Sequence, residues 1–185
     1  MSGPFDSLMA SADPAVVVVT TAAEGVRAGC LVGFHSQSSM SPQQYCLWLS
    51  KANHTYRVGL RAEHFAVHFL TADDLALAER FATRTGEETD KFAGLEVDAE
   101  EHGVPLLRRC PHRFLLERLT LLDDGGDHVS LTGRVRAAHT DGGFAPLRLT
   151  DVMHLAPGRP SEDRAIHPDR GASPPGCYLP LVRSS

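Results

Sequence analysis

Polar and cationic side chains follow directly after an apolar run in the first third of the chain. The apolar run is Tyr45–Leu49, and the polar residues after it are Ser50, Lys51, Asn53, His54 and Thr55. Hydroxyls and a cation at the start of a helix are suited to binding phosphate, because backbone N–H groups and positive charge both attract an anion. Simple helix capping by Asn53 or Thr55 explains the same pattern equally well.

A second polar cluster lies a few residues earlier, between two apolar runs. It consists of Ser36, Gln37, Ser38 and Ser39, in a stretch (residues 36–43) that we expect to be a loop. Hydroxyls and amides donate and accept hydrogen bonds, so such a loop can bind the polar edge of an isoalloxazine ring. Taken alone, the cluster fits a solvated turn better, since Ser is common in turns.

Residues 123–128, with the sequence DDGGDH, place a histidine beside a turn. Gly126, Asp127 and His128 lead from the turn into an alternating apolar run. Imidazole titrates near neutral pH, so His128 has the chemistry to orient a substrate or give it a proton. By itself, the motif is more simply interpreted as an exposed histidine next to a turn.

Several other kinds of site lack their sequence signatures. The four cysteines, at positions 30, 46, 110 and 177, do not have the spacing of zinc ligands, and we expect thiols. His64 and His68 are four residues apart, but no third ligand is near, so we predict no metal site. The sequence contains no P-loop, no nucleophile elbow and no dinucleotide-binding glycine motif.

The composition indicates a globular domain that does not act at a membrane. The chain has 185 residues, of which 42% are hydrophobic and 22% are charged, which suits a single core. The net charge of −5 and the lack of a basic stripe argue against nucleic-acid binding. No apolar run is long enough to cross a bilayer, and no signal peptide is recognisable. We therefore expect a cytoplasmic protein.

The spacing of apolar residues predicts more strands than helices. Strands are expected at Ala15–Thr21, Val26–Phe34, Tyr45–Ser50, Phe65–Leu70, Arg113–Leu122 and His128–Ala138, with a short strand or turn at Leu95–Ala99. A helix also fits Arg113–Leu122. Helices are expected at Phe5–Met9, from Asn53 or Thr55 to Arg61, and at Asp73–Thr83 after a capping box that begins at Thr71.

The expected strands form hairpins around turns at residues 22–25 and 123–126. Hairpins with one helix between them favour an antiparallel barrel with flanking helices over a parallel sheet. The prolines after residue 156 disfavour regular structure. We divide the chain into an arm (residues 1–14), one domain (residues 15–155) and a loop-rich tail (residues 156–185).

Taken together, these segments resemble the flavin reductase-like, FMN-binding split-barrel family. The similarity runs from about Ala15 to Ala138 and rests on motifs that occur in the family's order. They are VVVVTT, GCLVGFHSQSSMSP, CLWLSKANHTY, FAVHFLTADDLALAERFA, DKFAGL and GDHVSLTGRV. The resemblance implies a mainly β (α+β) fold, an antiparallel Greek-key split β-barrel with flanking helices.

The resemblance also implies roles for individual residues. Those expected to line the flavin ring are Ser36, Gln37, Ser38 and Ser39, and those expected along the ribityl phosphate are Ser50, Lys51, Asn53, His54 and Thr55. Lys91 and Phe92 would close over the cofactor. Gly126, Asp127 and His128 match the family's GDH motif, with His128 and Asp127 near the docked nicotinamide.

The activity implied by the resemblance is hydride transfer from NADH or NADPH to FMN, with FAD also possible. The family further implies a homodimer that supplies reduced flavin to a partner monooxygenase. Two alternatives stay open. One is a flavin-binding module without turnover, and the other is a flavin- or deazaflavin-dependent oxidoreductase with an organic substrate of its own.

Overall fold

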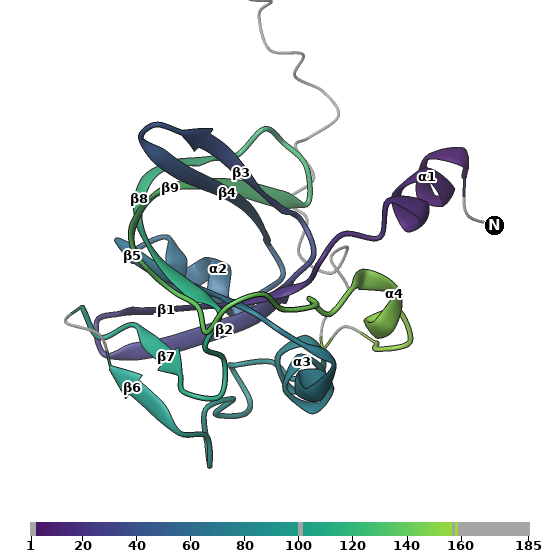
Figure 1. Cartoon of the computed structure of the whole chain (residues 1–185). Helices are drawn as coiled ribbons and strands as arrows, with labels where there is room; N and C mark the ends of the chain where they lie inside the picture. Colours follow the sequence, from purple (N-terminus) through teal and green to yellow (C-terminus); the bar gives the residue numbers. More distant parts are fainter. Residues whose placement is uncertain (1–2, 100–101, 157, 159–185) are drawn as a thin grey trace, which may run out of the picture.

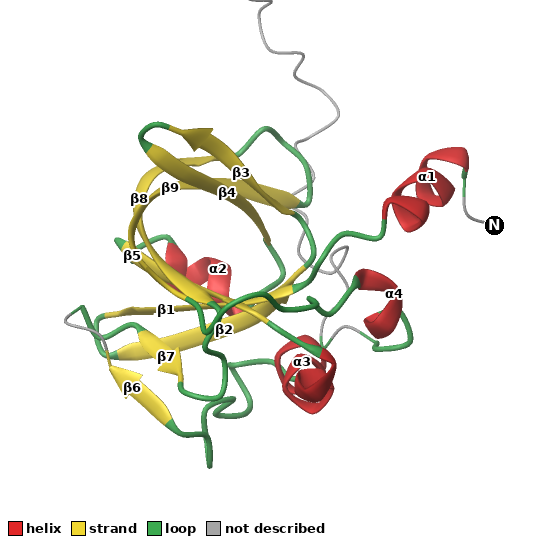
Figure 2. Cartoon of the chain, viewed as in Figure 1, coloured by secondary structure: helices red, strands yellow, loops and turns green. Residues whose placement is uncertain are grey.

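The computed structural model describes residues 3–99, 102–156 and 158, and its centre is a seven-stranded antiparallel sheet. The strands are β1 (Val17–Ala23), β2 (Val26–Val32), β3 (His35–Met40), β4 (Gln43–Ser50), β5 (His64–Phe69), β8 (Arg113–Leu122) and β9 (His128–His139). Their order across the sheet is β2-β1-β5-β8-β9-β4-β3. The sheet curls round on itself (Figures 1 and 2), and its end strands β2 and β3 do not pair with each other. The predicted split barrel with flanking helices is therefore confirmed.

The smaller elements lie at the ends and on one face of this sheet. They are α1 (Pro4–Ala12), α2 (His54–Gly59), η1 (Ala72–Asp74), α3 (Leu75–Thr83), β6 (Val97–Ala99), β7 (Pro105–Leu107) and α4 (Leu149–Val152). Strands β6 and β7 form a separate two-stranded sheet. Helix α3 packs beside β1 and β2, whereas α1 stands away from the rest of the chain (Figure 1).

Strand β1 explains how one apolar run builds two cores. Alternate side chains of a strand point to opposite faces. Val16 and Val18 therefore pack with Phe81 of α3 in one cluster, while Val17 and Val19 face the interior of the barrel in another. A strand that is buried on both faces is expected to be continuously apolar, and this accounts for the VVVV run.

The predicted hairpins and the third helix are confirmed. β1 pairs with β2 and β8 pairs with β9, so the helical alternative for Arg113–Leu122 is wrong. The capping box is also present, because Asp74 Oδ2 accepts hydrogen bonds from the backbone N–H and the hydroxyl of Thr71, both at 3.0 Å. The α-helix begins two residues later than predicted, since the box closes a 3-10 turn, η1.

One prediction, the polar loop at residues 36–43, is wrong. His35–Met40 forms strand β3, which pairs with β4. β3 is the last strand of the sheet, so most of its side chains are exposed and no apolar alternation marks it. Strand β7 and helix α4, which are short, were not predicted from the sequence. The predicted tail falls outside the described residues except for positions 156 and 158, and the domain boundaries stay a prediction.

Candidate functional site

An apolar pocket of about 360 Å³ lies where β2, β4, α3, β9 and α4 meet. Its lining consists of Cys30 and Leu31 from β2, Ser50 and Asn53 after β4, Phe81 and Ala82 from α3, His128 from β9, and Leu149, Val152, Met153 and Leu155 in and after α4. We call it the central pocket. The fold thus brings two neighbouring predicted site residues, Ser50 and Asn53, together with a third, His128, that is far from them in the sequence.

Gly29 lets α3 pack closely on β2 beside the central pocket. A Cβ atom at this position would lie 2.7 Å from the ring of Phe81, so only a glycine lets α3 pack this closely on β2. Leu31 lies on the same face of β2 as Gly29 and packs against the cluster that contains Phe81, whereas Cys30 belongs to the barrel interior. Both residues line the central pocket. A glycine inside a strand is a signal of close approach, and here the approaching group is an aromatic side chain of the protein itself.

A narrow polar crevice adjoins the central pocket, and the two hollows share Asn53 and Ala82. The polar side chains that line the crevice are Asn53, His54, Thr55, Arg84, Thr85 and Lys91. Four of these, Asn53, His54, Thr55 and Lys91, were predicted from the sequence to hold a cofactor. Asn53 is the N-cap of α2, but its side chain makes no capping hydrogen bond. Helix capping therefore does not explain the presence of this amide.

Lys91 is a buried cation on the wall of this crevice. Only 6% of the residue is exposed, and its ammonium donates hydrogen bonds to the carbonyls of Gly29 (3.1 Å) and Phe81 (3.0 Å). None of the ion pairs between described residues includes Lys91. A buried charge is costly unless an opposite charge accompanies it. Lys91 therefore places a positive charge, held by two backbone carbonyls, on the wall of a crevice of about 10 Å³.

Burial and this cation shift the pKa values of neighbouring groups. Burial lowers the pKa of Lys91, and the nearby Cys30 thiol partly opposes this shift. Burial raises the pKa of Cys30, which therefore stays a neutral thiol in the pocket wall. Burial, Arg57 and Lys91 together lower the pKa of His54, so its imidazole is neutral at neutral pH. Lys91 is thus the buried positive charge of the crevice.

His128 and Asp127 form a hydrogen-bonded pair at the mouth of the central pocket. His128 Nδ1 lies 2.8 Å from Asp127 Oδ1, and the ring packs against Phe34 with centroids 5.1 Å apart. Because a carboxylate only accepts hydrogen bonds, Nδ1 carries the proton, which leaves Nε2 as the acceptor of a neutral ring. The pair fixes the orientation and the tautomer of an imidazole that faces the pocket.

Lys51 is held at the β8–β9 turn and does not line either hollow. Its ammonium lies 2.7 Å from Asp123 Oδ1, and its backbone N–H donates to the carbonyl of Asp127 at 2.9 Å. Lys51, followed by the Gly125 N–H, lowers the pKa of Asp123. Gly126 lies in the same exposed turn. These two predicted residues therefore support the loop that carries Asp127 and His128.

The four predicted site residues on β3 lie apart from the central pocket. Ser36, Gln37, Ser38 and Ser39 do not line it or the crevice, and Gln37 Nε2 donates to the carbonyl of Ser39 within the same strand at 3.3 Å. Their role at the flavin ring stays a prediction. Phe92 is 4% exposed and packs edge-on against Phe81, so within this chain it belongs to the core beneath the crevice.

Sequence reasoning did not identify Cys30, Leu31, Phe81 or the residues of α4 as parts of the pocket. Gly29 was the available signal for the two β2 residues, because it marks the position where another group approaches the strand. Phe81 lies in the predicted helix Asp73–Thr83, and nothing in the sequence marked it as a pocket residue. For α4, which spans only Leu149–Val152, the sequence offered no comparable signal.

Comparison with known proteins identifies the family. The sequence matches the family model of the Flavin reductase like domain over residues 9–152. The chain belongs to this family. That confirms the resemblance inferred from the motifs, and it means that the central pocket is a pocket of a flavin reductase-like domain.

Named relatives of this flavin reductase-like chain include enzymes and enzyme components. The chain is 32% identical over 142 residues to "FMN reductase (NADH) SmoA" of Agrobacterium fabrum, covering 76% of this chain and 79% of the relative. It is 28% identical over 161 residues to the reductase component of a 4-nitrophenol 4-monooxygenase/4-nitrocatechol 2-monooxygenase of Rhodococcus opacus, covering 86% and 84%. Both alignments span most of each protein.

Solved structures show the same fold. The flavin reductase domain protein from Arthrobacter sp. FB24 superposes with a TM-score of 0.70 at 19% sequence identity, over 79% of this chain and 89% of that one. At this level of identity the similarity concerns the fold alone. In the part of the chain that the structure describes, no helix is long and apolar enough to cross a bilayer.

The chemistry of the lining residues suits a phosphorylated flavin, whose phosphate would lie at the mouth of the crevice, because the crevice itself has room for about one water molecule. The central pocket offers apolar walls from β2, α3 and α4 for a planar ring, and the adjoining crevice offers a buried cation with hydroxyl and amide groups. An apolar pocket with a few convergent polar groups is typical of cofactor sites. A phosphate would supply the negative charge that Lys91 lacks within the described chain.

Proposed function

We propose that this protein is an NADH-dependent flavin reductase that reduces FMN. The observation that carries the proposal is the junction of two hollows, one apolar and ending at His128, the other polar and containing the buried cation Lys91. This junction suits a molecule with an apolar ring at one end and a phosphate at the other. The NADH-linked FMN reductase activity named for the Agrobacterium relative supports the same proposal.

Each group of residues has a role in this proposal. Cys30, Leu31 and Phe81 would hold the ring, while Asn53, Thr55 and Lys91 would hold the phosphate. His128, oriented by Asp127, would position the nicotinamide through Nε2. A bound flavin supplies the hydride acceptor, so that NADH is oxidised to NAD⁺ as the flavin is reduced. The protein's contribution is to place the two rings together and to exclude water.

The experiment that tests the proposal measures NADH oxidation by the purified protein with FMN present. We expect turnover that depends on both reactants, and slower turnover with NADPH. Flavin binding without oxidation of either nicotinamide nucleotide would instead support a non-catalytic flavin-binding module. Reduction of bound flavin only in the presence of an organic substrate would support an oxidoreductase with its own substrate.

We further propose that reduced flavin passes to a separate monooxygenase, as the name of the Rhodococcus relative suggests for that protein. A coupled assay tests this step: the reductase, FMN and NADH should support hydroxylation by an added flavin-dependent monooxygenase. The transfer requires reduced flavin to leave the site. If the flavin stays bound after gel filtration of the reduced protein, transfer by diffusion is contradicted.

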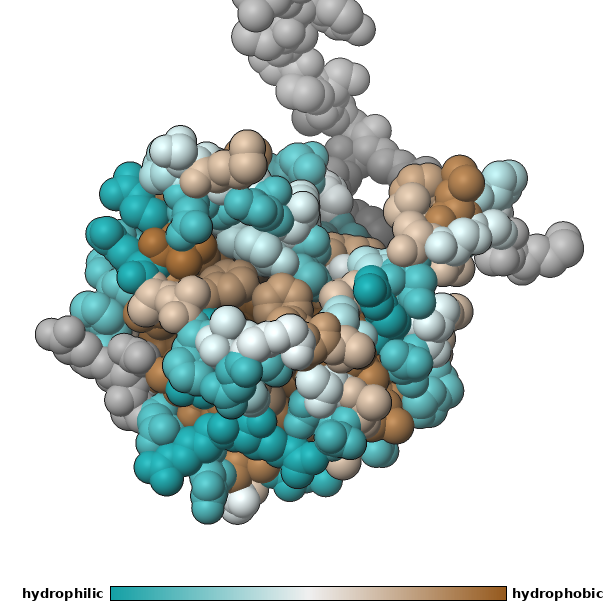
Figure 3. All heavy atoms as spheres, in the orientation of Figure 1, coloured by the Kyte–Doolittle hydropathy of each residue, from teal (hydrophilic) through white to brown (hydrophobic). Residues whose placement is uncertain are grey.

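We also propose a homodimer, and helix α1 supports it. Phe5, Leu8 and Met9 of α1 are 70%, 64% and 45% exposed, and no residue of the helix is buried. Figure 3 shows this apolar surface on α1, apart from the rest of the molecule. Exposed apolar patches of this kind mark association surfaces. Light scattering should give twice the 20.0 kDa of one chain, and a monomer mass would contradict the proposal.

A further inference from the structure

Phe34 contacts His128 without lining either hollow of the candidate site. It lies between β2 and β3, outside the central pocket and the crevice. Its ring packs on the imidazole of His128, with the ring centroids 5.1 Å apart and the planes tilted by 58°. Tilted aromatic pairs at this separation attract each other, because the positive edge of one ring meets the negative face of the other. Phe34 is therefore a neighbour that constrains the imidazole in addition to Asp127.

The hydrogen bond to Asp127 alone leaves the imidazole of His128 some freedom. The side chain of Asp127 is 50% exposed, so water competes for the carboxylate. A single hydrogen bond also tolerates a range of angles at the donor. A second ring packed against the imidazole narrows this range, because turning the imidazole would bring the two rings into collision. The direction of Nε2 thus depends on both neighbours.

Phe34 itself is attached to a well-fixed part of the sheet. Its carbonyl accepts a hydrogen bond from the Trp48 N–H at 2.9 Å. The next residue, His35, is held at both ring nitrogens, by the carbonyl of Ala15 at 2.8 Å and the hydroxyl of Tyr45 at 2.5 Å. A carbonyl only accepts hydrogen bonds, so Nε2 of His35 carries the proton and Nδ1 accepts from the hydroxyl. Burial lowers the pKa of His35, so the ring stays neutral at neutral pH and keeps both bonds.

The exposure of Phe34 argues against a role in the hydrophobic core. The residue is 55% exposed, and it belongs to none of the clusters of buried residues found in the described part of the chain. Its replacement by a smaller apolar side chain therefore leaves no buried cavity. The contact that the ring does make is with His128, at the mouth of the central pocket, where the nicotinamide is proposed to bind.

We propose that Phe34 is a positioning residue for hydride transfer, which acts by holding the imidazole of His128 in one orientation. Nε2 of His128 then has a fixed direction in which to accept a hydrogen bond from the carboxamide NH2 of nicotinamide. Hydride transfer requires the reacting rings to be aligned, so an imidazole that turns would lower the rate of the chemical step. The inference rests on the function proposed above and adds a residue that acts on the reaction through His128.

The first test is a double-mutant cycle in NADH oxidation with FMN. Phe34→Leu keeps an apolar side chain but removes the flat ring, and it should lower kcat about 3- to 10-fold. The FMN dissociation constant should change less than about twofold. Phe34→Tyr keeps the ring and should keep kcat within about twofold of the wild type. In the His128→Asn background Phe34→Leu should have no further effect, because its effect passes through the imidazole.

Phe144→Leu is the matched control. Phe144 is also an exposed phenylalanine, at 37%, and it also packs on a histidine, His112, with ring centroids 4.0 Å apart. It does not line the central pocket, so this variant should leave kcat unchanged. Thermal unfolding of each variant shows whether it is folded.

The second test needs neither flavin nor turnover. In the flavin-free protein, NMR relaxation gives the order parameter of the His128 Cε1–H bond, and the loss of this resonance in His128→Asn assigns it. We expect the order parameter to fall in Phe34→Leu, because the imidazole becomes more mobile, and to stay unchanged in Phe144→Leu.

Any one of three results would overturn the inference. They are an unchanged kcat in Phe34→Leu, an equal loss of kcat with and without the imidazole of His128, and an unchanged order parameter in Phe34→Leu. The second result would mean that Phe34 acts on the reaction directly. If the wild type oxidises NADH and one of these results is found, only the role of Phe34 fails. If the wild type oxidises no NADH with FMN, the proposed function fails and the inference fails with it.

Discussion

Replacing Lys91 with methionine is the sharpest test of the phosphate crevice. The substitution removes the buried ammonium but keeps an unbranched side chain of similar length. In the free protein it removes hydrogen bonds to the carbonyls of Gly29 and Phe81, and it also removes the cost of burying a charge. These two effects oppose each other. We therefore expect the free energy of unfolding to change by less than about 2 kcal/mol, measured by urea denaturation.

Flavin affinity should respond much more strongly than stability. A hydrogen bond between a charged donor and a phosphate contributes about 1.5–3 kcal/mol, so Lys91→Met should raise the dissociation constant of FMN roughly 10- to 150-fold. Riboflavin has the same ring without the phosphate. Its dissociation constant should change less than about threefold. Quenching of flavin fluorescence on titration with protein measures both constants.

Lys51→Met provides the matched control for this experiment. Lys51 is also a lysine close to the site, with 10% of its side chain exposed, but its ammonium pairs with Asp123 at the β8–β9 turn. We expect this variant to change FMN affinity less than about threefold. Lys91 does not bind the phosphate if Lys91→Met weakens the binding of riboflavin as much as that of FMN, or if Lys51→Met weakens FMN binding as much as Lys91→Met does.

Three further predictions concern the pocket walls and the core. His128→Asn should lower kcat/KM for NADH by about 10- to 100-fold with little effect on flavin affinity. His64→Asn, which is remote from the central pocket, should leave kcat/KM unchanged, and steady-state kinetics measure both variants. Gly29→Ala would place a Cβ 2.7 Å from the Phe81 ring, so calorimetry should show a loss of about 1–3 kcal/mol of stability. Burial lowers the pKa of His68 from 6.5 to about 4. The imidazole is protonated at a higher pH in the unfolded chain than in the folded one, so the free energy of unfolding should fall by about 3 kcal/mol between pH 6.5 and 4. An equal fall over this pH range in His68→Gln would contradict this.

The structure shows why His68 stays neutral. Its Nδ1 lies 3.2 Å from the carbonyl of Val18, and its Nε2 accepts a hydrogen bond from the Leu107 N–H at 3.2 Å. A ring with one donor and one acceptor nitrogen satisfies both partners, whereas a protonated ring would face the Leu107 N–H with a second donor. His68 therefore joins β1, β5 and β7 through its neutral form. The sequence alone suggested only a weak metal-ligand candidate at this position.

The sequence predicted the elements whose signals are local. The Asp123–Gly126 turn fixed the β8–β9 hairpin, and the Thr71–Asp74 box fixed the start of the third helix to within two residues. The DDGGDH motif also placed His128 at the start of the strand that follows the turn. In each case neighbouring residues in the chain interact with one another, so their spacing alone carries the information.

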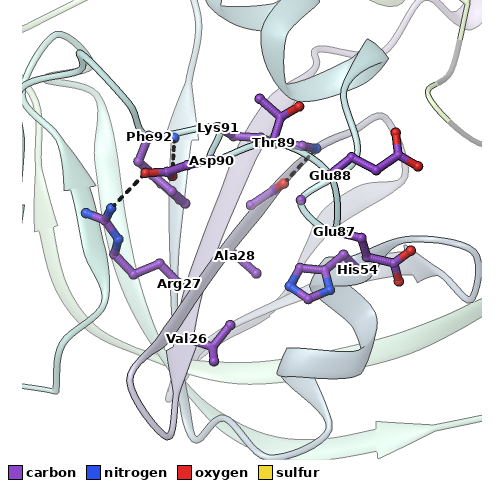
Figure 4. Close-up of a pocket in the computed structure, with 12 residues that line it drawn as sticks. Val26, Arg27, Ala28, His54, Glu87, Glu88, Thr89, Asp90, Lys91 and Phe92 are labelled. Atoms are coloured by element: carbon purple, nitrogen blue, oxygen red, sulfur yellow. Dashed lines mark hydrogen bonds and ion pairs between the residues drawn. The ribbon is translucent and has the colours of Figure 1, made fainter.

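The features that sequence analysis missed depend on contacts between distant segments. Strand β3 looked like a loop because an edge strand with exposed side chains has no apolar alternation. The burial of Lys91 could not be predicted either, since it arises where residues 29, 81 and 91 converge. Position 91 was assigned to the cofactor through the family resemblance. The fold determines how deeply the Lys91 side chain, shown in Figure 4, is buried, and it leaves the ammonium without a carboxylate partner among the described residues.

A crystal structure of the protein bound to FMN would show where the flavin lies. We expect electron density for the ring between β2 and α3, against Cys30, Leu31 and Phe81, with the phosphate at the mouth of the crevice beside Lys91. Density for the flavin at another surface of the chain, with the central pocket and the crevice free of it, would contradict the account.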